Sequence, residues 1–193
     1  MITLADIQRR VGVSPDGVWG RNTAQAIASA LGMTEAVTPP GGLLPSAKAI
    51  DLIHSFESLK LNSYRDPGSR NGLPITNGWG TTIDENGEPI PLGAVWTREK
   101  ADRLFARDLA KFSQKVAALL GSAPTTQNQF DALVSFAYNV GTGALADSTL
   151  LRKHKAGDYA GAKAEFARWN KNDGKVLNGL TKRRAAEAGL YGS

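Results

Sequence analysis

Two carboxylic residues, Glu57 and Asp66, are the first candidates for chemistry because their surroundings in the sequence differ. On a helix, Glu57 shares a face with Ile50 and Ile53, because the three residues are spaced three and four apart. Desolvation on such a face favours the protonated form that general-acid catalysis requires. Asp66 follows nine residues later in the turn-forming segment 64–68, where water should keep it ionised. One protonated and one ionised carboxyl group form the pair that cleaves glycosidic bonds.

Each candidate also has an ordinary structural interpretation. Glu57 could bend out to water or pair with an arginine, and Asp66 could be an Asx-turn residue. Thr76, in the segment ITNGWGTT, offers a hydroxyl that could hold a water molecule, but a threonine in a hairpin strand looks the same. The residues alone leave these alternatives open.

The elements that position these residues are predicted from periodicity and turn formers. A helix should begin after Ser46, its N-cap, and run to about Leu61. Segment 62–95 is dense in Gly, Pro, Asn and Asp, and should form a small β-hairpin or a three-strand region. This order of elements predicts an α+β fold that is mainly helical.

Further helices follow this region. A long amphipathic helix should be capped by Thr97, with its apolar side chains at helical spacing. The segment TQNQFDALVSFAYNVG predicts a second, strongly apolar helix. Three shorter helices are expected near residues 148–156, 159–169 and 180–190.

The chain should divide into three parts. Residues 1–34 predict a short helical unit, and residues 35–44 contain Pro39-Pro40-Gly41-Gly42, which is typical of a linker. Residues 45–193 are then the main domain.

Composition narrows the classes of function. The absence of cysteine excludes disulfides and thiolate nucleophiles. The two histidines, His54 and His154, lack the spacing of a zinc site, and we expect no metal or other cofactor. The net charge of +5 suits an anionic partner such as a cell wall, or serves solubility alone. The basic residues are dispersed rather than clustered with aromatics, so nucleic acid is a weaker candidate.

Targeting signals are not expected. The first residues contain no apolar core of a secretory signal, and no run approaches the roughly 18 apolar residues of a membrane span. We therefore expect no stable membrane insertion.

The candidates together resemble the phage-type lysozymes (endolysins) of glycoside hydrolase family 24. Glu57, Asp66 and Thr76 follow that family's pattern of a Glu at a helix end, an Asp nine residues on and a Thr in a Gly-rich hairpin. The segments QFDALVSFAYNVGTGALADSTLLRKHKAGDY and FARWNKNDGKVLNGLTKRRAAEAGLY are similar to its central helix and C-terminal region. The similarity covers about residues 45–191.

The resemblance implies a lysozyme-like α+β fold and an N-acetylmuramidase that cuts the β-1,4 bond between N-acetylmuramic acid and N-acetylglucosamine. It implies that Glu57 is the general acid, that Asp66 directs the attacking water and that Thr76 holds it. Arg183, in preference to Arg184, matches the basic residue that pairs with the catalytic Glu. Tyr138 and Asn139 are expected to contact sugar, whereas Trp79 and Trp169 are expected to be core residues rather than sugar platforms.

The resemblance also implies a partner and a location. The partner is bacterial peptidoglycan, and the protein should be a monomer that waits in the host cytoplasm for release to the periplasm and cell wall, causing lysis. Residues 1–34 resemble part of a peptidoglycan-binding module, with its signature at Asp16, Gly17, Trp19, Gly20 and Thr23.

Two departures from the family pattern keep alternatives open. The segment between Asp66 and Thr76 is longer than usual, and Thr81 stands where the family commonly has His. A displaced Thr76 could turn the enzyme into a lytic transglycosylase acting on the same bond. A catalytically inactive cell-wall-binding protein is the other alternative.

Overall fold

The computed structural model describes residues 3–12, 30, 42–65 and 71–193 of the chain. Two compact units are present. The first, called the helical unit, comprises residues 1–53 and 110–193, and the second, called the hairpin unit, comprises residues 54–109. Helices α3 (Ala47–Phe56) and α4 (Arg98–Leu120) each begin in one unit and end in the other.

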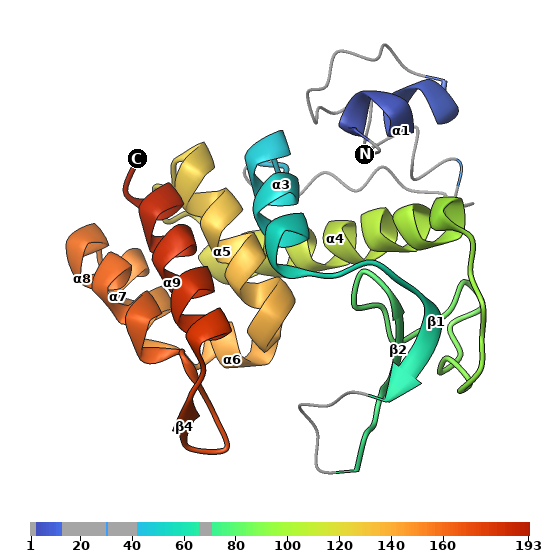
Figure 1. The fold of residues 1–193 in the computed structure, drawn as a ribbon. Helices are drawn as coiled ribbons and strands as arrows, with labels where there is room; N and C mark the ends of the chain where they lie inside the picture. Colours follow the sequence, from blue (N-terminus) through green and yellow to red (C-terminus); the bar gives the residue numbers. More distant parts are fainter. Residues whose placement is uncertain (1–2, 13–29, 31–41, 66–70) are drawn as a thin grey trace. The chain divides into compact units, whose positions relative to one another are not determined.

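Two helices form the centre of the helical unit. Helix α5 (Gln127–Val140) packs along α9 (Asn178–Tyr191), as Figure 1 shows. A capping box starts α5, because the Thr126 hydroxyl accepts from the Gln129 backbone while the Gln129 side chain accepts from the Thr126 backbone. The side chains of residues 129–137 are all buried, so α5 is surrounded by protein on every side.

Shorter elements connect α5 to α9 along the chain. They are α6 (Thr142–Ala146), α7 (Thr149–Lys155), α8 (Tyr159–Glu165), the 3₁₀ helix η1 (Phe166–Arg168) and the antiparallel pair β3 (Lys171–Asn172) and β4 (Lys175–Val176). The three predicted short helices are confirmed as α7, α8 and α9. The sequence reading missed α6 and the β3–β4 hairpin, although Asp173-Gly174 was a turn signal. Both residues have positive φ (46° and 76°), which is typical of a two-residue type I′ turn.

An antiparallel hairpin dominates the second unit. Strand β1 (Lys60–Arg65) pairs with β2 (Ile75–Gly78), with Tyr64 opposite Thr76. The predicted hairpin is confirmed, and in the described residues the third strand is reduced to isolated bridges such as the one between Asn62 and Val95.

The first helix of the main domain ends earlier than the sequence pattern predicts. Ser46 is its N-cap as expected, since its hydroxyl accepts from the Lys48 backbone at 3.2 Å. The helix stops at Phe56 rather than near Leu61, and Lys60 already belongs to β1. Residues 60–63 alternate between exposed and half-buried, so pairing with β2 decides their conformation over the helical period.

The long helix and its cap were predicted correctly. Helix α4 spans Arg98–Leu120, and the Thr97 hydroxyl accepts from the Lys100 backbone at 3.2 Å. Its apolar residues are buried at the expected period, including Phe105, Leu109 and Val116.

The N-terminal part is described only in fragments. Helix α1 (Leu4–Arg10) confirms the first predicted helix and has a Thr3–Asp6 capping box. The module-like signature and most of the expected linker lie outside the described residues, so the three-part division stays a prediction. Among the described helices, none combines the length and apolar character that crossing a membrane requires.

Candidate active site

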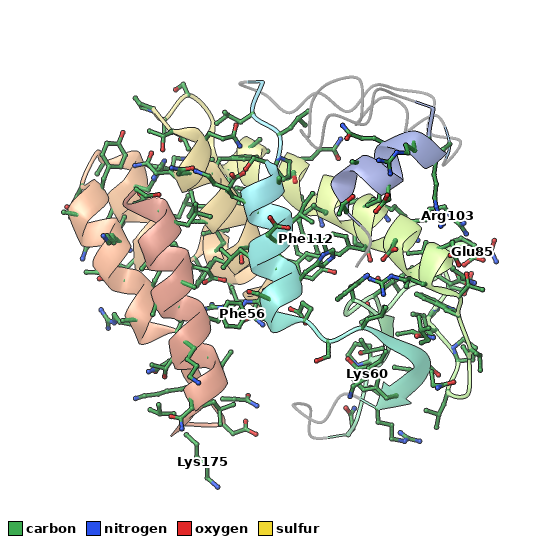
Figure 2. The ribbon with its side chains drawn as sticks, turned by 45° about the horizontal axis from the view of Figure 1, so that its top comes forward. Phe56, Lys60, Glu85, Arg103, Phe112 and Lys175 are labelled. Atoms are coloured by element: carbon green, nitrogen blue, oxygen red, sulfur yellow. The ribbon has the colours of Figure 1, made fainter. Side chains whose placement is uncertain are left out.

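Glu57 lies in the bend that joins α3 to β1. Phe56 ends the helix and Lys60 begins the strand, and both are labelled in Figure 2. The carboxylic residue is therefore one position beyond the helix, and the sequence argument that placed it on a helical face needs correcting. Glu57 is half-buried, so the change of backbone leaves it neither in bulk water nor sealed in the core.

Thr76 lies in the β1–β2 hairpin, and Asp66 follows β1 in the sequence. Thr76 is in β2 and only 7% exposed, and its hydroxyl donates to the Pro74 carbonyl at 3.4 Å. Asp66 follows the last residue of β1 in the sequence but lies outside the described residues. The water-directing roles of both residues stay predictions.

A buried aromatic cluster supports the end of α3 and the turn after β2. The ring of His54, three residues before Glu57, stacks on Trp79 at 4.1 Å between centroids and lies 4.5 Å from Phe105. The Trp79 indole N–H donates to Asp102 at 2.7 Å. Trp79 is 9% exposed and is a core residue, in agreement with the expectation from sequence.

The surroundings of His54 disfavour its positively charged form. Burial lowers its pKa to about 4, and the positive charge of Arg98 acts in the same direction. The imidazole is therefore neutral at neutral pH and serves as a flat packing surface. Sequence reasoning considered this residue only as a metal ligand and missed its place beside Trp79.

The glycine that ends β2 is required by close packing. Gly78 has φ 64°, and a Cβ added there would approach the Ala101 Cβ at 3.1 Å and the Trp96 ring at 3.3 Å. Nearby, the Thr81 hydroxyl donates to Asp108 at 3.0 Å. The threonine that departs from the family pattern is thus a buried structural contact, 2% exposed.

In the helical unit, Arg183 belongs to a buried ionic cluster. Its Nε donates to Glu187 at 3.2 Å, and its Nη2 donates to the Ser135 carbonyl at 3.4 Å. Arg184 Nε also lies 3.0 Å from Glu187 Oε2. Arg183 and Glu57 belong to different units, so their ion pair stays a prediction. The sequence resemblance included Glu187 in its C-terminal segment but gave it no role, although its spacing of three and four from two arginines was a usable signal.

The predicted sugar contacts lie at the C-terminal end of α5. The ring of Tyr138 is half-buried and 5.2 Å from that of Phe112. Asn139 is exposed, and its Oδ1 accepts from Arg184 at 2.8 Å. Trp169 packs edge-on against Phe136 at 5.2 Å, which supports the core interpretation for this tryptophan.

The titratable side chains do not form a metal centre in the described part of the chain, where no group of three or more His, Cys, Asp or Glu residues is suited to hold an ion. His154 has a structural environment, since Nδ1 lies 2.6 Å from the Tyr191 hydroxyl and Nε2 lies 2.9 Å from the Thr125 hydroxyl.

Comparison with known proteins identifies the class. Residues 54–187 match the family model of phage lysozyme, which is well over half of the chain. The chain therefore belongs to the phage lysozyme family, and its fold is the lysozyme-like α+β fold expected from sequence.

Individual relatives sharpen this assignment. The endolysin of Bacillus phage B103 is 42% identical over 146 residues, covering 76% of this chain and 53% of the relative. The endolysin of Acyrthosiphon pisum secondary endosymbiont phage 1 is 41% identical over 77% of this chain and 97% of the relative. The chain thus spans about half the length of the Bacillus phage relatives that it matches.

Solved structures agree. An endolysin from Escherichia coli O157:H7 phage FAHEc1 superposes with a TM-score of 0.69 at 38% identity, over 79% of this chain and 95% of that one. The muramidase domain of SpmX from Asticaccaulis excentricus has a TM-score of 0.64 at 35% identity, over 75% of this chain and 95% of that domain.

Proposed function

We propose that this protein is a phage endolysin that hydrolyses the β-1,4 bond between N-acetylmuramic acid and N-acetylglucosamine in bacterial peptidoglycan. The observation that carries the proposal is the family match over residues 54–187, which contains every candidate site residue. The names of the relatives, endolysins and a muramidase domain, support the same activity.

In the proposed mechanism Glu57 is the general acid. Glu57 is half-buried and directly follows α3, and in this role it would donate a proton to the leaving glycosidic oxygen. Asp66, directly after β1, would direct water to the opposite face of the sugar, with Thr76 on the neighbouring strand holding that water. Arg183 would pair with Glu57, and Tyr138 and Asn139 would contact sugar.

Lysis of permeabilised Gram-negative cells tests the assignment of the acid. Glu57→Gln keeps the size of the side chain but removes the proton donor, so clearance of turbidity should fall by a factor of about 10² or more. Glu88→Gln is the matched control, because Glu88 is an exposed carboxylic residue of the same hairpin unit. Clearance by Glu57→Gln at the wild-type rate would refute the proposed role.

Mass analysis of the released fragments identifies the reaction. Hydrolysis adds water and gives reducing ends, whereas a lytic transglycosylase forms a 1,6-anhydro product, and a wall-binding protein without turnover releases nothing. Direct attack of water inverts the anomeric centre, for which carboxyl groups about 6.5–9.5 Å apart are typical. Retained configuration would exclude the water-directing role of Asp66.

We also propose that the protein acts as a monomer on the wall, binds no nucleic acid and stays in the host cytoplasm until its release. The net charge of +5 should concentrate it on the anionic wall, and salt should weaken this attraction. Light scattering of the purified protein and sedimentation with isolated walls at rising salt test these points. Salt-dependent DNA binding without lysis would contradict them.

A further inference from the structure

Glu187 is a fully buried acidic residue on α9, in the same helix as Arg183 and Arg184. Glu187 is 0% exposed. Its Oε1 accepts hydrogen bonds from the Ser135 hydroxyl at 2.9 Å, from Arg183 Nε at 3.2 Å and from Arg184 Nη2 at 3.3 Å. Its Oε2 lies 3.0 Å from Arg184 Nε. One carboxylate therefore contacts two consecutive arginines and the neighbouring helix α5.

The two arginines are nearly as buried as the carboxylate. Arg183 is 3% exposed and Arg184 is 1% exposed, and buried charges are costly unless they are paired. The two guanidinium groups repel each other, which contributes to a lowered pKa of Arg184 after the larger effect of burial. Glu187 forms an ion pair with each of the two arginines, and this pairing offsets part of the cost of burying them.

The two arginines that pair with Glu187 connect it to candidate functional residues. Arg183 is the predicted partner of the catalytic acid, and Arg184 donates to Asn139 Oδ1 at 2.8 Å. The Arg184 guanidinium also lies over the Phe136 ring, with its Cζ 4.9 Å from the ring centre. A buried carboxylate on α9 is thereby linked, through Arg184, to an exposed amide at the end of α5.

We propose that Glu187 is a positioning residue for the glycosidase reaction: it fixes the guanidinium of Arg183 and, through Arg184, the side chain of Asn139. The inference rests on the proposed function and deepens it. A residue that only stabilised the fold would contribute the same stability, but it would not act on catalysis through these two residues.

A double-mutant cycle on the turnover of purified peptidoglycan separates the two roles. The variants are Glu187→Gln, Asn139→Ala and their combination, with kcat/KM measured at a temperature where circular dichroism shows each to be folded. We expect Glu187→Gln to lower kcat/KM by about tenfold and the double variant to fall no further, because Asn139 is already misplaced. Additive losses, or full kcat/KM for folded Glu187→Gln, would overturn the positioning role.

Glu165→Gln is the matched control in the same unit. Glu165 is 7% exposed and pairs with Lys153 at 2.7 Å and Arg168 at 3.3 Å, so the substitution also removes a carboxylate that pairs with two cations, which here are more exposed than Arg183 and Arg184. Alone it should leave kcat/KM unchanged, and combined with Asn139→Ala it should add no loss to that of Asn139→Ala.

A milder variant covers the case in which Glu187→Gln does not fold. Arg184→Lys keeps the charge but cannot reach Glu187 and Asn139 together, so KM should rise severalfold while kcat stays within about twofold. An unchanged KM would overturn the link to Asn139. If the wild type turns over peptidoglycan and the losses of kcat/KM from Glu187→Gln and Asn139→Ala are additive, only the positioning role is rejected. If the wild type shows no turnover, the proposed function is rejected as well.

Discussion

Each unit of the protein contains a titratable side chain that is shielded from water near a candidate functional residue, and the two side chains are accommodated in opposite ways. In the hairpin unit, the ring of His54 contacts the rings of Trp79 and Phe105, which also contact each other, and its charged form is disfavoured. In the helical unit, Glu187 is compensated by Arg183 and Arg184, and burial raises its pKa while the two guanidinium groups oppose that change. The first cluster excludes charge and the second pairs it, so the two should respond differently to substitution and to pH.

The largest effect should come from breaking the paired cluster. Glu187→Ala leaves two buried guanidinium groups without their shared anion, and we expect the free energy of unfolding to fall by about 3–5 kcal/mol. Urea denaturation measures this. Replacing Arg183, Arg184 and Glu187 together by Met should recover part of the loss, because apolar side chains of similar size leave no uncompensated charge in the cluster; no recovery would show that the ionic pairing is not the cause.

Acidification should break the neutral cluster instead. The pKa of His54 is about 4 in the folded chain and 6.5 in the unfolded chain, so the unfolded state binds the proton first. The stability that this residue contributes is complete above pH 6.5 and is lost as the pH falls toward 4, by up to about 3 kcal/mol. Denaturant midpoints at several pH values measure the slope.

His54→Phe is the control for this pH dependence. It keeps an aromatic ring beside Trp79 and Phe105 but cannot take up a proton. The free energy of unfolding of the variant should change less between pH 7 and pH 4.5 than that of the wild type. The remaining slope belongs to the carboxylic residues and to His154, whose pKa burial also lowers. An unchanged slope would mean that His54 does not titrate in this range.

A smaller effect is expected from the hydrogen bond that closes the aromatic cluster. Trp79→Phe keeps most of the stacking but removes the indole N–H that donates to Asp102 at 2.7 Å. The loss should be about 1–3 kcal/mol, because a buried carboxylate oxygen loses its donor. Thermal unfolding of Trp79→Phe and of the double variant with Asp102→Asn measures it, and equal stability of Trp79→Phe and wild type would contradict the assignment.

The smallest effect on stability is expected from removing the threonine caps at the starts of α5 and α4. Thr126→Ala removes the capping box of α5, the central helix of the helical unit, and should cost about 1 kcal/mol. Thr97→Ala removes the hydroxyl that caps α4 in the hairpin unit and should cost a similar amount. Thermal denaturation compares the two, and a loss well above 2 kcal/mol for either would indicate a role beyond capping.

Much of this architecture was predictable from local patterns. The spans of α4 and α5 follow from apolar periodicity and from threonine caps at residues 97 and 126, because both signals act within a few residues of chain. The hairpin follows from turn formers between short apolar runs. The order of Glu57, Asp66 and Thr76 also indicated the family, which the match over residues 54–187 confirmed.

Other features depended on contacts that a single stretch of sequence does not contain. The helix that leads to Glu57 ends at Phe56 because residues 60–65 pair with β2, which comes later in the chain. Helix α6 is too short to show a period, and the β3–β4 strands have only two residues each. Such elements are stabilised by their surroundings rather than by their own composition.

By itself, the sequence determined the fold class, the family and the types of the candidate catalytic residues, because helical period, caps and residue spacing are local properties. Only the tertiary structure decided where Glu57 leaves its helix, that His54 packs as a neutral ring on Trp79, and that Glu187 carries the compensating charge for two arginines. The physical reason is desolvation: whether a polar side chain is paired, neutral or solvated depends on neighbours that folding brings from distant parts of the chain.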